Sequence, residues 1–387
     1  MRPMWHLDPG IDQLNHGSFG ATPVPVLDAQ DRLRRQMEAN PTQFLTVDVS
    51  PLLAAARADA ASFVGADPAG FAFVPNATTG VNAVLQSMAP SLGSGDELLT
   101  TDHAYNACRN VLDFHASRVG ASVRTVTLPF PIDSPEQASE LILGAIDSRT
   151  RLVLVDHVTS PSGLVLPVER LVAELEPEVA VLVDGAHSVG MLPLDLVELG
   201  ASYYAGNFHK WVCAPKGTGF LWARPDRRED VVPPVVSHGW NSPVTGNRLH
   251  DLFDWMGTVD PTPHLTVPDA LETMGGAHPD GWDGLMKANH DLAVTARDLL
   301  CDALGIDPPA PDEMLGSMAA VPLPPGVGAD PGMVDPFTHL LRDLHHFEVP
   351  VFAFPRWPER VIRVSAQVYN RVEQYQRLAA VLREVMG

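Results

Sequence analysis

The stretch that decides the fold is Val181-Leu182-Val183-Asp184-Gly185-Ala186-His187, an apolar run that ends in a carboxylate, a glycine and a histidine. Such a run is typical of a strand that is buried on both faces of a parallel sheet. A second apolar segment, residues 201–206, ends just before Asn207-Phe208-His209-Lys210. Because the carboxyl ends of parallel strands meet at one edge of a sheet, we expect Asp184 and Lys210 to share that edge.

Other short apolar runs precede and follow these two, and helix-like stretches lie between several of them. The further strands are predicted over 71–75, 97–101, 122–128, 151–157 and 217–223, and helices over 79–88, 106–119 and 135–146. Alternation of this kind predicts an α/β fold with a mainly parallel seven-stranded sheet and helices on both faces. Polar residues fall at or just past the strand ends, namely Asn76, Asp102, Asp156, Asp184 and Asn207.

The character of the chain changes after residue 260, where Asp260-Pro261-Thr262-Pro263 reads as a break. A helix is expected over 284–303, strands over 316–322, 350–354 and 361–366, and a final helix from Val372. This pattern predicts a smaller α+β domain. The predicted division is an N-terminal arm over residues 1–20, a large domain over 21–260 and a small domain over 261–387.

Composition excludes several classes of protein. The 387 residues carry a formal net charge of −21, which disfavours nucleic acid and anionic membrane surfaces as partners. There is neither an 18-residue apolar run nor an apolar stretch of signal-peptide length at the start, so we expect no transmembrane helix and a cytoplasmic location. The three cysteines, Cys108, Cys213 and Cys301, are too widely spaced for a disulfide framework or a zinc pattern.

Lysine is scarce in this chain, which makes Lys210 informative. Only Lys210, Lys216 and Lys287 occur among 26 basic residues, and the rest are arginine. An ammonium group can lose its proton and condense with an aldehyde, whereas a guanidinium effectively cannot. A lysine and an aspartate at neighbouring strand ends are what a pyridoxal 5'-phosphate (PLP) site needs. Lys216 remains an alternative, and so does a purely structural role for Lys210.

The ring of such a cofactor needs further contacts. Asp184 would pair with the pyridine nitrogen, and His187 would reach the phenolic oxygen, as would Thr159 or Ser160 from the neighbouring strand end. Tyr105, after the strand over 97–101, would stack on the ring. A structural arginine for Asp184 and a core position for Tyr105 are the alternatives.

The phosphate would lie at the start of the helix that follows Asn76. Backbone N–H groups there, with the hydroxyls of Thr78 and Thr79, make an anion cradle, although the same sequence also suits an ordinary helix cap. Asn207 and His209 would add donors beside Lys210, and the alternative for His209 is a structural histidine.

Two segments are candidates for binding the substrate. Arg363 lies within an otherwise apolar strand, where its planar fork suits a substrate carboxylate, or alternatively a salt bridge at a domain edge. The glycine-punctuated loop 15–20 would close over the substrate, with Asn15 and His16 as contacts, although its sequence by itself indicates only a turn.

Together these segments resemble the class V aminotransferase family of fold-type I PLP enzymes, and most closely its isopenicillin N epimerase group. The motifs follow the family's order along nearly the whole chain. They are residues 14–20, 38–44, 76–82, 184–188, 207–211, 217–220 and 363–370.

The resemblance implies a role for each candidate residue. Lys210 is the lysine that holds the cofactor's aldehyde, and Arg363 binds the substrate carboxylate. The resemblance also implies a homodimer, in which Thr258 of one chain reaches the phosphate site of the other. The remaining cofactor contacts implied in this way are Thr78, Thr79, Tyr105, Asp184, His187, Asn207 and His209.

The expected reaction begins with removal of the α-proton of an amino acid by Lys210 as general base. Epimerisation is the first prediction, and a C–S or other β-lyase or an aminotransferase is the second. Epimerisation needs an acid on the face of the substrate opposite Lys210; the sequence does not identify this acid, and His16 is a candidate. Cysteine desulfurases of this family use a cysteine before the carboxylate-binding arginine, and none occurs between Asp302 and Arg363, which argues against persulfide chemistry.

Two other classes of function remain open. A metal-dependent hydrolase would use Asp102, His103, Asp156 and His157 with Asp184 and His187, but these residues lack a known metal-ligand spacing. No metal site is therefore predicted. A protein that binds the cofactor without catalysis is the other alternative.

Overall fold

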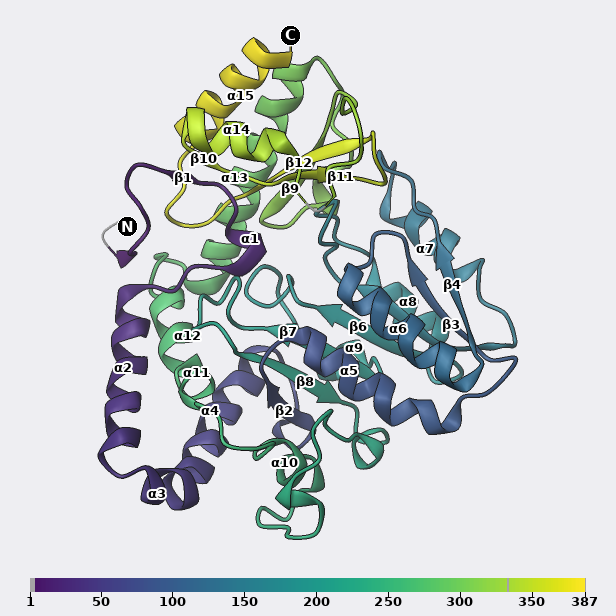
Figure 1. The fold of residues 1–387 in the computed structure, drawn as a ribbon, viewed down its shortest axis with the longest axis vertical. Coiled ribbons are helices and arrows are strands. Elements are labelled where there is room, and N and C mark those ends of the chain that lie inside the picture. The colour runs from purple at the N-terminus through teal and green to yellow at the C-terminus, as the bar shows by residue number, and fades with distance from the viewer. Residues whose placement is uncertain (1–3, 333, 387) are drawn as a thin grey trace.

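A seven-stranded sheet forms the centre of the molecule, as described by a computed structural model that covers residues 4–332 and 334–386 (Figure 1). The strand order is β2-β8-β7-β6-β5-β3-β4, and all neighbours are parallel except β8, which is antiparallel to β2 and β7. The predicted α/β fold with a mainly parallel sheet is therefore confirmed. The strands are β2 (Phe71–Val74), β3 (Glu97–Thr101), β4 (Ser122–Val126), β5 (Thr150–Asp156), β6 (Ala180–Gly185), β7 (Tyr203–Asn207) and β8 (Gly219–Ala223).

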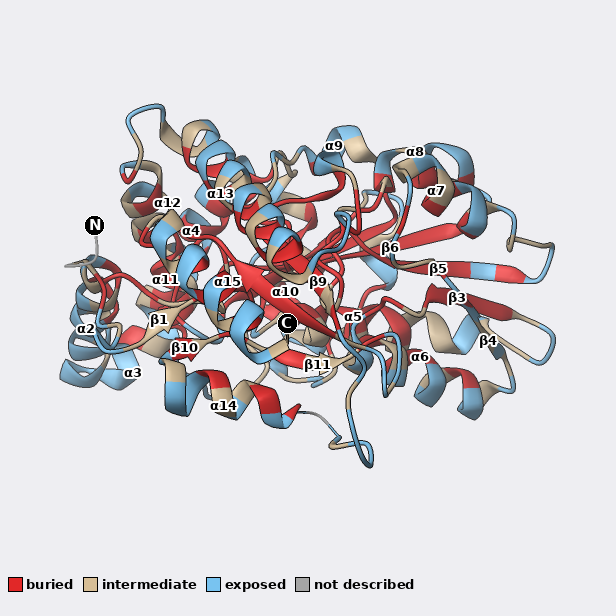
Figure 2. Ribbon diagram, turned by 90° about the horizontal axis from the view of Figure 1, so that it is seen from above, coloured by how far each residue is buried: buried red, intermediate tan, exposed pale blue. Residues whose placement is uncertain are grey.

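The sheet is buried on both faces because its strands supply side chains to two separate cores. In β6, Val181 and Val183 belong to one core and Leu182 to the other. One core is completed by α4 (Val49–Phe63), α7 (Pro135–Leu143) and α8 (Val168–Leu175), and the other by α5 (Ala77–Met88) and α6 (Asn106–Val119). Figure 2 shows the buried strands between helices whose outer faces are exposed.

A smaller α+β region follows in the chain. Its antiparallel sheet has the order β11-β12-β9, and a third core joins this sheet to α13 and α15. The N-terminal arm lies against this region, because β1 pairs with β10 in parallel. The elements are β1 (Asp12–Gln13), α13 (Gly281–Leu304), β9 (Met318–Leu323), α14 (Pro336–His345), β10 (Phe347–Glu348), β11 (Val351–Ala353), β12 (Arg360–Ser365) and α15 (Val372–Met386). The domain boundaries at 20 and 260 stay predictions, and the first three residues of the arm lie outside the described chain.

The remaining helices are short or lie at the periphery of the sheet. They are α1 (His16–Phe19), α2 (Val24–Ala39), α3 (Pro41–Gln43), α9 (Leu196–Leu199), α10 (Arg248–Phe253), α11 (Thr262–Leu265) and α12 (Val267–Gly275). Single turns of other helix types are η2 (Phe44–Asp48), η3 (Pro68–Gly70), η4 (Ala89–Ser91), η5 (Arg228–Asp230), η6 (His238–Trp240) and η7 (Asp312–Met314). Across residues 4–332 and 334–386, no helix combines the length and the apolar character needed to cross a membrane.

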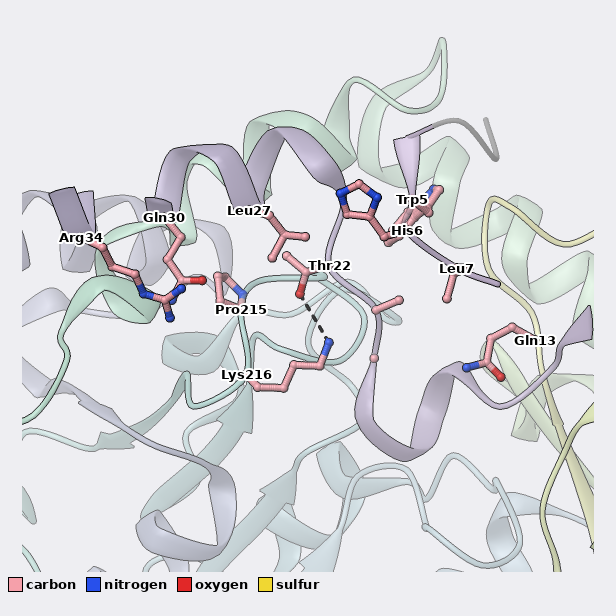
Figure 3. Close-up of a pocket in the computed structure, with 12 residues that line it drawn as sticks. Trp5, His6, Leu7, Gln13, Thr22, Leu27, Gln30, Arg34, Pro215 and Lys216 are labelled. Carbon is pink, nitrogen blue, oxygen red and sulfur yellow. Dashed lines mark hydrogen bonds between the residues drawn. The ribbon is translucent and has the colours of Figure 1, made fainter. Parts of the chain in front are cut away.

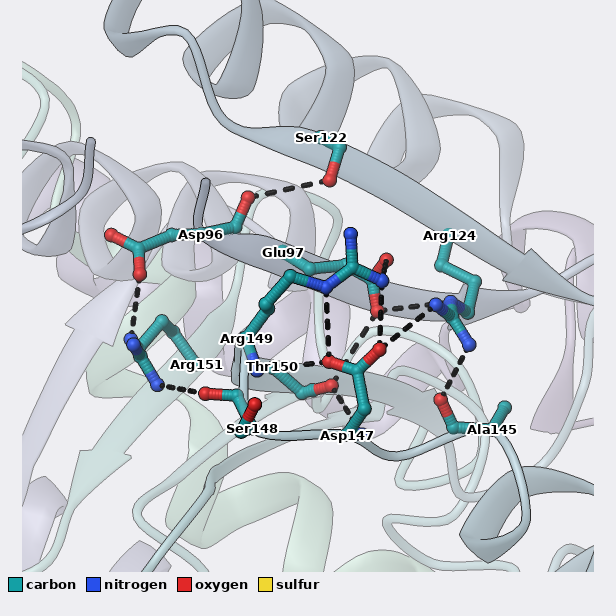
Figure 4. Close-up of polar contacts among 10 residues, drawn as sticks. All are labelled: Asp96, Glu97, Ser122, Arg124, Ala145, Asp147, Ser148, Arg149, Thr150 and Arg151. Atoms are coloured by element: carbon teal, nitrogen blue, oxygen red, sulfur yellow. Dashed lines mark hydrogen bonds and ion pairs between the residues drawn. The ribbon is translucent and has the colours of Figure 1, made fainter. Parts of the chain in front are cut away.

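A cluster of ion pairs closes the amino ends of β3, β4 and β5 (Figure 4). Glu97 is 4% exposed, and its carboxylate pairs with Arg124 at 2.9 Å and with Arg149 at 3.6 Å. Asp147 pairs with the same two arginines. The strands therefore have structural ion pairs at their amino ends, which leaves the carboxyl ends for a site.

Candidate active site

A cavity of about 510 Å³ lies at the carboxyl ends of the strands and brings most of the predicted cofactor residues together. Its lining includes the lysine, the aspartate and the start of α5 that the sequence singled out. Those predicted residues are Thr78, Thr79, Tyr105, Asp184, His187, Asn207, His209 and Lys210.

Lys210 follows β7 and projects into this cavity beside His187. Its Nζ lies 3.0 Å from Nε2 of His187. Burial lowers the pKa of Lys210 to about 8, while the carboxylate of Asp184 opposes that shift. Burial and the nearby positive charges hold the pKa of His187 well below its usual value, so the ring is neutral and accepts a hydrogen bond from the lysine. A neutral amine is thus accessible at Lys210 at mildly alkaline pH.

Lys216 lies in a different cavity, which Figure 3 shows between the N-terminal segment and α2. Its ammonium group contacts only the hydroxyl of Thr22 among the residues drawn, at 3.5 Å. No carboxylate in that lining is placed to pair with a pyridinium nitrogen, since the lining residues include neither Asp nor Glu. Of the two neighbouring lysines, only Lys210 therefore has the surroundings that the predicted chemistry needs.

Asp184 lies one residue before the end of β6, and both of its carboxylate oxygens accept hydrogen bonds from the chain. Oδ1 accepts the backbone N–H of Ala186 at 3.0 Å, and Oδ2 accepts the thiol of Cys108 at 3.1 Å. Burial raises the pKa of Asp184, while these donors and Lys210 lower it. Two donors and a nearby cation favour the ionised form, which is the form that would hold a protonated ring nitrogen.

The start of α5 forms the end of the cavity where an anion would lie. Asn76 caps the helix by accepting the backbone N–H of Thr79 at 2.9 Å. Asn207 accepts the N–H of Ala77 at 2.8 Å, which leaves the amide nitrogen of its side chain as a donor. His209 donates through Nδ1 to the carbonyl of Thr218 at 2.8 Å, so that Nε2 is the nitrogen left for a ligand.

Arg363 projects from β12 toward residues that line the cavity, although it does not itself line the cavity. Its guanidinium donates to the hydroxyl of Ser18 at 3.1 Å and to the backbone carbonyl of Ser160. It is 4% exposed, and burial lowers its pKa to about 10. Asn15 supports this arrangement, since its Oδ1 accepts the hydroxyl of Ser18 at 2.5 Å.

Three predicted contacts lie elsewhere in this chain. His16 is buried, and its ring bonds the Lys210 carbonyl and the Tyr369 hydroxyl, each at 2.9 Å, instead of facing the cavity. Thr159 turns its hydroxyl toward Ser162 at 2.6 Å. Thr258 is exposed and is not part of its own chain's cavity.

Two of the histidines considered for a hydrolase have hydroxyl partners outside that set of side chains. His103 bonds the hydroxyl of Ser162 at 2.7 Å, and His157 bonds the hydroxyl of Tyr204 at 2.9 Å. Within the described residues, no group of three or more His, Cys, Asp or Glu side chains is arranged to hold a metal ion.

Two residues of the site were missed from the sequence. Cys108 contacts Asp184 from α6, and Ser18 contacts Arg363 from α1. The one signal for Cys108 was its position in the first turn of α6, three residues after Tyr105, which precedes that helix. Ser18 lies inside the loop that was proposed to approach the substrate.

The cavity is suited to PLP, because some polar atoms of its lining residues have no hydrogen-bond partner within the described chain. Nδ1 of His187 and Oδ1 of Asp156 are buried and have no hydrogen-bond partner in the described chain, although both residues line the cavity. Buried polar atoms without partners are costly, so a ligand with complementary groups is expected there. An amine, a carboxylate and a helix start around one cavity match an aldehyde, a ring nitrogen and a phosphate.

Comparison with known proteins agrees with this geometry. The family model described as aminotransferase class-V matches residues 19–247. The chain is 37% identical to isopenicillin N epimerase from Amycolatopsis lactamdurans, over 98% of this chain and 96% of that protein. It is 34% identical to putative L-cysteine desulfhydrase 1 from Oryza sativa subsp. japonica, over 96% of this chain and 83% of that protein.

Solved structures share the fold. The cystine C–S lyase C-DES, in complex with its reaction product cysteine persulfide, aligns with a TM-score of 0.80 and 22% identity, over 97% of this chain and 98% of that one. The cysteine desulfurase CsdA from Escherichia coli aligns with a TM-score of 0.79 and 19% identity, over 100% of this chain and 98% of that one.

Proposed function

This chain belongs to the class V aminotransferase family, and from that premise we propose that it is a PLP-dependent enzyme that epimerises an amino acid at its α-carbon. The observation that carries the proposal is the Lys210 amine, 3.0 Å from a neutral His187 in a cavity that Asp184 also lines. Similarity to isopenicillin N epimerases along nearly the whole chain supports epimerisation over the family's other reactions.

PLP, when bound, supplies an aldehyde that condenses with amines and a ring that withdraws electrons from the bonds of the attached α-carbon. Lys210 would hold the aldehyde, and Asp184 would hold the proton on the ring nitrogen. His187 would donate to the phenolic oxygen through Nδ1, which has no partner within the part of the chain that the structure describes. Thr78, Thr79, Asn207 and His209 would bind the phosphate, with Tyr105 against the ring.

The chain's own residues would then bind the substrate and move its proton. Arg363 would bind the α-carboxylate, with Ser18 fixing the direction of the guanidinium. The neutral amine of Lys210 would take the α-proton, and its pKa near 8 suits a general base at cellular pH. Return of a proton to the opposite face would complete the epimerisation.

A β-lyase is the second candidate, because two relatives named as putative L-cysteine desulfhydrases are each 34% identical over 96% of this chain. The same residues would hold the cofactor and remove the α-proton, and the reactions would differ in whether a sulfur substituent leaves the β-carbon. The chain's cysteines, Cys108, Cys213 and Cys301, are all buried, so a thiol that attacks the substrate's sulfur is not part of this proposal.

One experiment distinguishes these candidates. The purified enzyme would be incubated in heavy water with a panel of L-amino acids and cysteine-containing peptides, with chirality, deuterium at the α-carbon, keto acids and sulfide measured together. Inverted, deuterated substrate without keto acid supports the epimerase, and sulfide with pyruvate supports the lyase. A protein that remains colourless with PLP, or a Lys210→Ala variant that reacts at the parental rate, contradicts both.

We also propose a homodimer and a cytoplasmic location. The exposed position of Thr258 outside its own cavity supports a role at the partner's phosphate, as the family resemblance implies. Free thiols at all three cysteines suit a reducing compartment. Light scattering of the purified protein and fractionation of the producing cells test the two statements.

A further inference from the structure

Asp156 is a second buried carboxyl group beside Asp184. It ends β5, and the sheet register places it directly opposite Asp184 on the neighbouring strand β6. Adjacent strands lie about 4.8 Å apart and paired side chains share a face, so the two carboxyl groups are close neighbours. Both residues line the cavity, and each is 2% exposed.

The two carboxyl groups differ in their partners. Both oxygens of Asp184 accept hydrogen bonds from the chain, from Ala186 and Cys108. Asp156 accepts one, from the backbone N–H of Tyr105 to Oδ2 at 3.2 Å, while Oδ1 is buried and has no partner in the described residues. An ionised carboxylate with a bare buried oxygen is costly, whereas a protonated one presents an O–H donor at that position.

The charges around Asp156 favour the same assignment. The charged groups that act on it are Asp184 of β6 and Lys210 after β7, its hydrogen-bond donor is the backbone N–H of Tyr105, and the neutral thiol of Cys108 lies nearby on α6. Burial raises the pKa of Asp156 well above its usual value, and the negative charge of Asp184 raises it further. One lysine cannot neutralise two carboxylates, so the group with fewer donors takes the proton.

We propose that Asp156 is a positioning residue that holds a proton at neutral pH and leaves Asp184 as the anionic member of the pair. Its O–H, which has no acceptor among residues 4–332 and 334–386, then faces the group that occupies the cavity. This inference rests on the proposed function, because that group is the family's cofactor. A single negative charge beside the ring nitrogen matches the single proton that this nitrogen carries.

Infrared spectroscopy of the cofactor-free protein tests the proton directly. The wild-type protein at pH 7 should show the carbonyl stretch of a protonated carboxyl group, and Asp156→Asn should lack that component. Asp184→Asn is the matched control, because removing the neighbouring charge should let Asp156 ionise at lower pH. If the wild-type and Asp156→Asn spectra match at pH 7, the inference is overturned. If a variant does not fold, the pH titration of the wild-type spectrum decides the question by itself.

Cofactor affinity gives a second readout that separates this inference from the proposed function. Because an amide mimics the neutral acid, Asp156→Asn should weaken PLP binding by less than about threefold, and Asp184→Asn by more than about tenfold. Equal losses in the two variants would show that Asp156 acts as a second anion and would contradict the inference. If the wild-type protein binds no PLP, the proposed function fails, whereas the infrared result on the cofactor-free protein still stands.

Discussion

His187 lies with Nε2 3.0 Å from Nζ of Lys210, which places a neutral acceptor against the lysine as donor. The positive charges of Lys210 and Arg363 add to burial in keeping the ring neutral. Burial likewise lowers the pKa of Lys210, against the opposing charge of Asp184. The lysine that is expected to carry the cofactor is therefore easier to deprotonate than a lysine in water.

The first prediction concerns the rate at which the cofactor-free protein takes up PLP. Only the neutral amine of Lys210 attacks an aldehyde, so the rate should rise about tenfold per pH unit up to pH 8 and level off above it. Absorbance of the attached cofactor would be followed after mixing, with Lys210→Ala as the control without attachment. A rate that continues to climb to pH 10 would show that the lysine has an ordinary pKa.

A second prediction concerns recognition of the substrate carboxylate. Arg363→Lys should lower kcat/KM by about 10- to 100-fold, because a point charge replaces a fork that makes charge-assisted hydrogen bonds of about 1.5–3 kcal/mol each. Arg360→Lys, on the same strand but paired with Asp335, is the matched control and should have little effect. The kcat/KM for amino-acid amides, which lack the carboxylate, should not change in Arg363→Lys. Equal losses of kcat/KM for the acids and the amides would contradict this role of Arg363.

The third prediction tests whether two chains share each site. Lys210→Ala and Thr258→Asp should each be inactive alone, the second because a carboxylate would repel the phosphate. Mixed and reassembled, they should regain up to about one quarter of the parental activity, since half of the chains pair unlike and each such pair has one intact site. No recovery from a mixture that light scattering shows to contain dimers would exclude Thr258 from the partner's site.

The residues that meet at the carboxyl edge of the sheet could be predicted from the sequence. Side-chain contacts between segments far apart in the chain could not. Asp184 and Lys210 follow apolar strands, and the geometry of parallel sheets then places them together. The thiol of Cys108 reaches Asp184 from α6, and no local pattern specifies such a contact across 76 positions. Helix α2 was not anticipated because its sequence is polar overall and few of its side chains are buried, namely Val26, Ala29 and Gln30.

His16 illustrates the same limit within the site itself. Its sequence context, a glycine-punctuated loop, indicated a turn near the substrate and left the direction of the ring open. In the structure the loop carries α1, and the ring points to the backbone of Lys210 and to Tyr369 of the C-terminal region. Because Nε2 donates to a carbonyl, Nδ1 must accept from the tyrosine hydroxyl, which fixes the neutral tautomer.

The last prediction follows from this fixed tautomer. Burial lowers the pKa of His16 from 6.5 to about 4 in the folded protein. A lowered folded pKa means that His16 contributes no penalty above pH 6.5, and that stability is lost as pH falls from there toward 4, by about 3 kcal/mol in all. His16→Gln should remove this part of the pH dependence, so the variant should become more stable relative to the parent as the pH falls. Tyr369→Phe is the companion change, because it leaves Nδ1 without a donor and should cost about 1–3 kcal/mol at neutral pH. Urea unfolding of the cofactor-free proteins between pH 4 and pH 8 measures both effects.

Because His157, His209 and His264 also have pKa values lowered to about 4 and remain in every variant, they cancel in the difference from the parent. A difference between His16→Gln and the parent that stays constant over this range would show that His16 has the same pKa in the folded and unfolded protein, which would contradict the buried, neutral ring.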